Sequence, residues 1–127
     1  QAIAHVHYEG GYALDAQENL SLQQVNAKLA KFGGKFSEDI GRVYYANFCD
    51  FENVRSLHMV VEGENGKVSV FVVPHNEAYL SEGSSSDTKY NSQAIDLKRA
   101  SIIIVGEEGA NVSNMKEQLN KKLQFSA

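Results

Sequence analysis

The apolar pattern predicts three consecutive antiparallel strands in the central part of the chain, from Arg42 to Pro74. Arg42–Phe51, Ser56–Glu62 and Lys67–Val73 are rich in β-branched and aromatic residues, which favour strands. In the first of these strands, strict alternation places Val43 and Tyr45 on one face. Aromatic side chains fall on both of its faces, which predicts cover on both sides for part of its length.

A tight hairpin is predicted between the second and third strands, at Glu62–Gly66. Its Asn65-Gly66 pair tolerates the positive φ angles that such turns require. Pro74 cannot donate a ladder hydrogen bond, so it should close the third strand.

Two amphipathic helices are predicted, at Ser21–Phe32 and Val112–Leu123. Ser21 and Gln24 form a capping-box pattern, and Gly33-Gly34 is a typical helix end. Either Asn111 or Asn114 is a candidate N-cap of the closing helix.

Ala100–Val105 is almost wholly apolar, which favours a strand in the middle of the sheet. A short helix at Ala2–Glu9 is also compatible with the pattern. Together these elements predict an α+β fold: an antiparallel sheet of four to five strands with the two amphipathic helices packed on one face. The length of 127 residues suits a single domain, residues 1–127.

The least regular region is His75–Leu97, which contains a Ser-rich tract. A stretch of this length without clear periodicity is either a mobile surface loop or a binding segment. For the second case, His75, Tyr79 and Tyr90 are the candidate interaction residues.

Charge argues against nucleic-acid binding. The formal net charge is -4, and the 12 Lys and Arg residues are scattered along the sequence. A nucleic-acid surface normally needs a concentrated positive stripe.

Two constellations offer chemistry, each with a structural alternative. Cys49 and His58 lie on strands that are adjacent in the chain, so a thiol site is conceivable, although a buried core cysteine is the simpler interpretation. His5, His7 and Glu9 would share one side of a strand and could bind a metal, but their spacing matches no specific metal motif. We therefore predict no catalytic residues, no metal site and no cofactor.

Segments that together cover nearly the whole chain match a known pattern: His5–Glu9, Val25–Leu29, Phe32–Gly33, Val43–Ala46 with Cys49, Leu57–Val61, Gly66–Pro74 and Ile103–Glu107. In these segments the chain resembles an uncharacterised anti-sigma-factor-like family of single-pass inner-membrane proteins of Gram-negative bacteria.

The resemblance implies a non-enzymatic sensory or interaction domain at the periplasmic face of the inner membrane. The chain begins with Gln1, so we expect a fragment of a longer membrane-anchored protein, which touches the membrane only through a missing upstream span. Its partner would be a protein, met through the open sheet face or an edge strand, and a homodimer through a sheet edge is a further expectation. The alternatives are a small-molecule or metal-binding module using His5 and His7, with His58 or His75 as a further candidate ligand, and, less favoured, a thiol enzyme.

Overall fold

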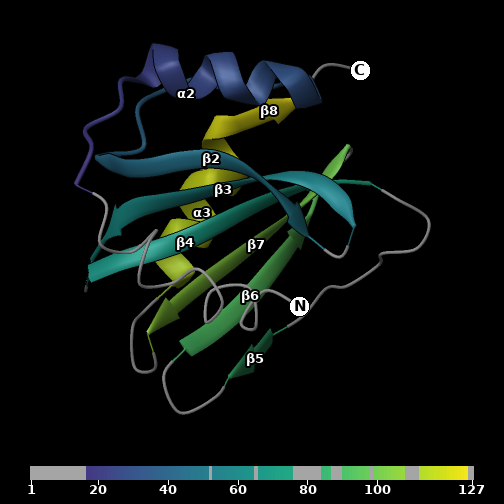
Figure 1. The fold of residues 1–127 in the computed structure, drawn as a ribbon. Coiled ribbons are helices and arrows are strands. Elements are labelled where there is room, and N and C mark those ends of the chain that lie inside the picture. Colours follow the sequence, from purple (N-terminus) through teal and green to yellow (C-terminus); the bar gives the residue numbers. More distant parts are fainter. Residues whose placement is uncertain are drawn as a thin grey trace.

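The computed structural model describes residues 17–51, 53–64, 66–75, 84–86, 90–97, 99–107 and 112–125. It is an α+β fold built on a six-stranded antiparallel sheet in the order β2-β3-β4-β7-β6-β5 (Figure 1). The strands are β2 (Val43–Phe51), β3 (Val54–Gly63), β4 (Gly66–Pro74), β5 (Ser84–Ser86), β6 (Tyr90–Asp96) and β7 (Ala100–Glu107). The predicted fold class is therefore correct, and the sheet has one strand more than the upper expected number.

The predicted meander of β2, β3 and β4 is confirmed. Leu57 on β3 pairs with Phe48 on one side and with Val72 on the other. The β3–β4 hairpin closes at the Gly63–Gly66 pair, and Gly66 has a φ of 125°. Gly66 therefore belongs to the ladder itself, so the Asn65-Gly66 pair does not occupy the two central positions of the turn.

Strand β2 contains an irregularity that the alternation pattern does not reveal. Val43 pairs with Val61, whereas Tyr45 pairs with Val60, so Tyr44 is an extra residue in the ladder. This bulge moves Tyr45 to the face opposite Val43. The prediction that these two residues share a face is therefore wrong.

Helix α2 (Leu22–Leu29) begins as its sequence predicts. The Ser21 hydroxyl accepts from the Gln24 backbone N–H at 3.1 Å, and the Gln24 side chain accepts from the Ser21 N–H at 2.8 Å. The helix continues as the 3-10 turn η1 (Ala30–Phe32) and ends at Gly33, whose φ is 75°. Glycine adopts this left-handed conformation at little cost.

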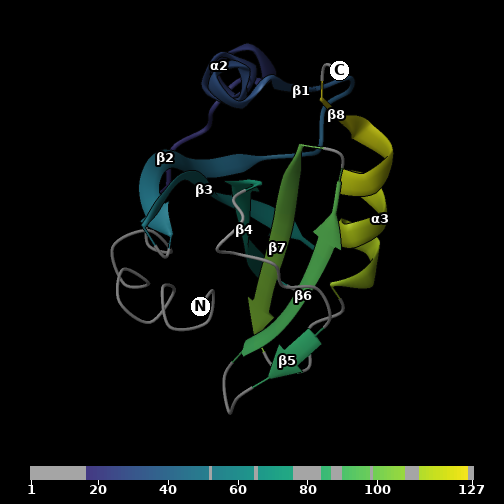
Figure 2. The same cartoon turned by 90° about the vertical axis from the view of Figure 1, so that its right-hand side faces the viewer.

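A second, two-stranded sheet joins the end of α2 to the end of the chain. It consists of β1 (Gly34–Phe36) and β8 (Leu123–Phe125), which follows helix α3 (Ser113–Lys122) (Figure 2). The side-chain amide of Asn26 bonds both the N–H and the C=O of Phe36, at 2.8 and 3.2 Å. Helix α2 is thereby fixed to the strand that follows it, and that strand pairs with β8 from the other end of the sequence.

The N-cap of α3 differs from expectation. Val112 occupies the N-cap position without a side-chain hydrogen bond, and Asn114 lies inside the helix. Asn111, the other candidate, lies outside the described residues. Val112 itself is 2% exposed, so packing rather than capping positions the start of this helix.

The segment His75–Leu97 is more regular than the sequence predicts, because it contains two strands. Strand β6 pairs with β7 along its whole length, and β5, drawn from the Ser-rich tract, pairs with β6. Strand β7 lies between β4 and β6, which confirms its predicted place inside the sheet.

Both faces of the sheet are buried. Val25 and Leu29 of α2 and Met115 and Leu119 of α3 share one core cluster with side chains of the sheet, including Leu57. The opposite face, which we call the second face, carries residues between 0% and 8% exposed: Tyr45, Ser56, His58, Val60, Ser69, Phe71, Val73, Ala94, Ser101, Ile103 and Val105. The expectation of an open sheet face for recognition is therefore wrong.

Candidate functional site

Positively charged side chains gather around the ring of Phe48, near the end of β2. Lys28 and Lys31, from α2 and η1, place their Nζ atoms 5.4 and 5.6 Å from the ring centroid. Arg55, on β3, places Cζ 5.7 Å from it. These distances are within the range of cation–π attraction. We call Lys28, Lys31, Phe48 and Arg55 the basic cluster.

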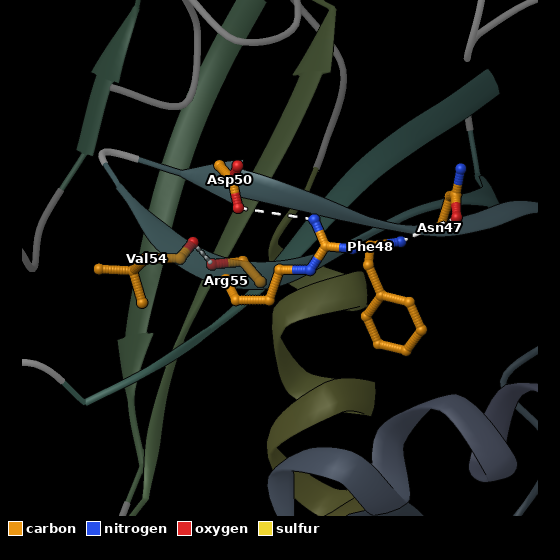
Figure 3. Close-up of polar contacts among 6 residues, drawn as sticks. Asn47, Phe48, Asp50, Val54 and Arg55 are labelled. Carbon is orange, nitrogen blue, oxygen red and sulfur yellow. Dashed lines mark hydrogen bonds and ion pairs between the residues drawn. The ribbon is translucent and has the colours of Figure 1, made fainter.

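Strand pairing brings Arg55 into this cluster. Asp50 pairs with Arg55 across β2 and β3, and their side chains are 3.5 Å apart (Figure 3). The Arg55 side chain is 65% exposed and the Asp50 side chain 72% exposed, so the ion pair contributes little to stability. Figure 3 shows the Phe48 ring beside the same guanidinium group, on the side of the sheet where the helices lie.

A hollow of about 500 Å³ adjoins the basic cluster at the end of the sheet. Lys31 belongs both to the basic cluster and to the lining of the hollow. The other described residues of the lining are Phe32, Gly33, Pro74, His75 and Arg99. The hollow is wide open to the surface rather than an enclosed cleft. The hollow therefore combines two cationic side chains with an apolar wall.

Backbone pairing fixes the far side of this hollow. Pro74 on β4 pairs with Ala100 on β7, and the His75 N–H donates to the Arg99 carbonyl at 3.1 Å. The His75 imidazole Nε2 lies 2.8 Å from Asp96 Oδ1, which also accepts from the Ser101 hydroxyl at 3.2 Å. His75 and Arg99 are thus held side by side, although 24 positions separate them in the sequence (99 − 75).

The opposite end of the sheet has a smaller hollow of about 310 Å³. It is lined by Glu62 and Glu64, beside Ile40, Gly63, Val68, Asn114, Met115 and Gln118. Lys67 pairs with Glu62 at that end, and Asp50 lies beside Arg55 in the basic cluster, so both ends carry charges of both signs.

A family model described as "Protein of unknown function (DUF3379)" matches residues 1–123 of the chain. The chain belongs to this family. No curated protein and no solved structure matches the DUF3379 chain significantly. The described part of the structure contains no helix that is both long enough and apolar enough to span a bilayer.

The two residues of the predicted thiol site are diagonal neighbours in the DUF3379 domain rather than opposite each other. Cys49 pairs with Ser56, and His58 pairs with Asn47. Cys49 is partly buried and packs against the apolar residues of the second face. His58 is 1% exposed, and its Nε2 lies 3.0 Å from the Ser69 hydroxyl. These surroundings are those of a cysteine that packs in the core, which is the simpler of the two interpretations of Cys49.

Two of the predicted interaction residues, His75 and Tyr90, lie apart. His75 lies at the hollow, but Tyr90 begins β6 at its other end, opposite Glu107. The seven residues of β6 separate them by about 20 Å. Tyr79, His5 and His7 lie outside the described residues. Within the described ranges, no three His, Cys, Asp or Glu side chains are grouped as metal ligands would be.

Sequence reasoning missed Lys31, Phe48, Arg55 and Arg99 as site residues, because it treated the positive charges as scattered. They come from separate parts of the DUF3379 domain and meet through the register of β2, β3, β4 and β7 and through the position of η1 beside the sheet. No local pattern of the sequence could have grouped them.

Proposed function

We propose that this domain is a non-enzymatic sensory or interaction domain, and that the basic cluster is the surface where it meets an acidic partner. The observation that carries the proposal is the convergence of Lys28, Lys31 and Arg55 on one aromatic ring. Aromatic and arginine side chains at a surface are typical of the residues that dominate interface energies.

The physical properties of the cluster support binding of an acidic segment. Lys31 and Arg55 are exposed, and Lys28 and Phe48 are half-buried, so all four are accessible in part. Their positive field would speed the encounter with a negatively charged partner. The half-buried ring offers apolar contact area beside the charges.

The cellular setting of the proposal comes from the resemblance described above. In that setting, the domain is the periplasmic part of a membrane-anchored, anti-sigma-factor-like regulator, and its contact with a protein partner changes transcription. The resemblance is the support for the location, the membrane anchor and the regulatory role.

The test uses the full-length protein in its native bacterium. A Lys28→Gln/Lys31→Gln variant removes two charges from the basic cluster, and RNA sequencing compares it with a strain in which the whole domain is deleted. We expect both strains to change the same transcripts, because both lose the contact with the partner. The matched control is Lys116→Gln/Lys121→Gln on α3, which should behave as the wild type.

The control is matched in charge, and each pair includes a lysine from the last turn of its helix, Lys28 or Lys121. Any loss of favourable interaction with the helix dipole is therefore similar in both variants. If domain deletion leaves every transcript unchanged, the regulatory role is wrong. If domain deletion changes transcripts but the Lys28→Gln/Lys31→Gln variant behaves as the wild type, the contact surface lies elsewhere.

A further inference from the structure

We propose that Asp50 is a built-in competitor of the acidic partner. Its carboxylate occupies Arg55 in the free protein, and a carboxylate from an acidic peptide segment of the partner protein replaces it on binding. This inference rests on the proposed function and deepens it, because it names a contact within the domain that keeps binding at the basic cluster weak and reversible.

Strand register fixes the carboxylate beside the basic cluster. Asp50 pairs with Arg55 in the β2–β3 ladder, next to the Phe51–Val54 pair that closes the hairpin. Asp50 and Phe48 are two residues apart on β2, so their side chains project to the same face of the sheet. Opposite residues of an antiparallel pair have Cβ atoms roughly 4.5–5.5 Å apart. The backbone itself therefore holds the competing carboxylate at the cluster.

Only one of the three cations of the cluster is occupied. Arg55 Nη1 lies 3.5 Å from Asp50 Oδ1, as the dashed line in Figure 3 shows. Among the described residues, no carboxylate lies within ion-pair distance of Lys28 or Lys31. The two lysines are therefore available for the first contact with an acidic segment, whereas Arg55 becomes available only when Asp50 releases it.

The exposure of the pair allows this exchange. Both side chains are largely in water, where an ion pair is screened and its separation costs little. The Phe48 ring, 5.7 Å from Arg55 Cζ, gives the guanidinium a second contact that keeps it at the cluster. The incoming carboxylate can therefore take the place of Asp50 without a rearrangement of the backbone.

The exchange lowers the affinity below what three available cations would give. An arginine guanidinium forms charge-assisted hydrogen bonds to any carboxylate, so the bond gained from the partner replaces one lost from Asp50. The net gain at Arg55 is small, and most of the attraction comes from Lys28 and Lys31. A contact of this kind exchanges readily, which suits a domain that reports a changing signal.

Calorimetric titration of the 127-residue chain with a hexaglutamate peptide, blocked at both ends, tests the proposal. We expect Asp50→Asn to bind the peptide about threefold more tightly than the wild type, because Arg55 no longer has an internal partner. The matched control is Glu117→Gln, which removes the same charge from an exposed position on α3. It should leave the affinity almost unchanged.

A double-mutant cycle separates competition for Arg55 from a general effect of charge. In an Arg55→Gln background, Asp50→Asn should no longer tighten peptide binding, because there is no guanidinium left to compete for. A threefold gain that persists in that background, or an equal gain in Glu117→Gln, would show that Asp50 acts only through its charge.

Two further results would overturn the inference: no gain in affinity in Asp50→Asn, or no saturable binding of the peptide. The proposed function is judged separately. If Asp50→Asn and the wild type bind the peptide equally while Lys28→Gln/Lys31→Gln weakens binding or changes transcription, the competitor role is wrong and the contact surface stands.

Discussion

His58 lies almost parallel to Phe71, with 4.3 Å between the ring centroids and 14° between the planes. The two residues pair across β3 and β4, and Tyr45 meets the same imidazole edge-on at 5.5 Å. A histidine that is 1% exposed between two aromatic rings is part of the packed interior. The second face of the sheet is therefore a core surface that contains a few buried polar side chains.

The hydrogen bond of this buried histidine should contribute measurably to stability. Replacement of Ser69 by Ala removes the hydroxyl 3.0 Å from the imidazole Nε2. We expect the free energy of unfolding to fall by about 1–2 kcal/mol, because a buried polar atom loses a partner. Urea denaturation measures it. Ser37→Ala, which removes an exposed hydroxyl bonded to the Lys122 carbonyl, should cost less than about 0.5 kcal/mol.

The two faces of the sheet should be equally sensitive to truncation. Val60 and Val61 are neighbours on β3, point to opposite faces and are both 0% exposed. Val60→Ala and Val61→Ala should each lower the free energy of unfolding by about 2–3 kcal/mol, from lost burial and the cavity left behind. A negligible effect of Val60→Ala in urea denaturation would show that the second face is open to solvent.

The capping box of α2 gives a local prediction. Ser21→Ala should destabilise the protein by about 1 kcal/mol, because the Gln24 N–H loses its acceptor. Ser21→Asp should restore most of this stability, since a carboxylate also caps. Gln23→Ala alters an exposed neighbour and should have little effect on the thermal midpoint. An equal loss in Ser21→Ala and Gln23→Ala would contradict a capping role.

Gly34 leaves room for the Phe125 ring of the C-terminal strand. A Cβ atom at this position would lie 2.7 Å from Cε1 of Phe125. Gly34→Ala should therefore cost about 1–3 kcal/mol through overpacking. A double-mutant cycle with Phe125→Ala checks the cause, because the clash is absent when the ring has been removed. Simple additivity of the two changes would mean that the contact with Phe125 is not responsible.

Features with a local cause were predictable. The start of α2 depends on residues three apart, and its end depends on the conformational freedom of Gly33, so both follow from short stretches of sequence. The meander was also predictable, because its three strands are apolar and adjacent in the chain. Strand β7 was recognised for the same reason, since an apolar run of that length favours a buried strand.

Features that depend on contacts with distant parts of the chain were not predictable. The β2 bulge at Tyr44 follows from the register with β3. Strands β5 and β6 have polar sequences and form by pairing with their neighbours, in a context that overrides weak β propensity. The N-cap of α3 is set by the burial of Val112 rather than by a capping asparagine.

By itself, the sequence determined helices α2 and α3, the meander of β2, β3 and β4, and strand β7, and it determined that they build an α+β domain, because periodicity and capping act over a few residues. Tertiary structure decided that burial extends over both faces of the sheet, beyond the part of β2 for which the sequence indicated cover on both sides. It also decided that Lys31, Phe48 and Arg99 gather at one end of the sheet. Strand register sets which distant residues become neighbours, and no short-range pattern encodes it.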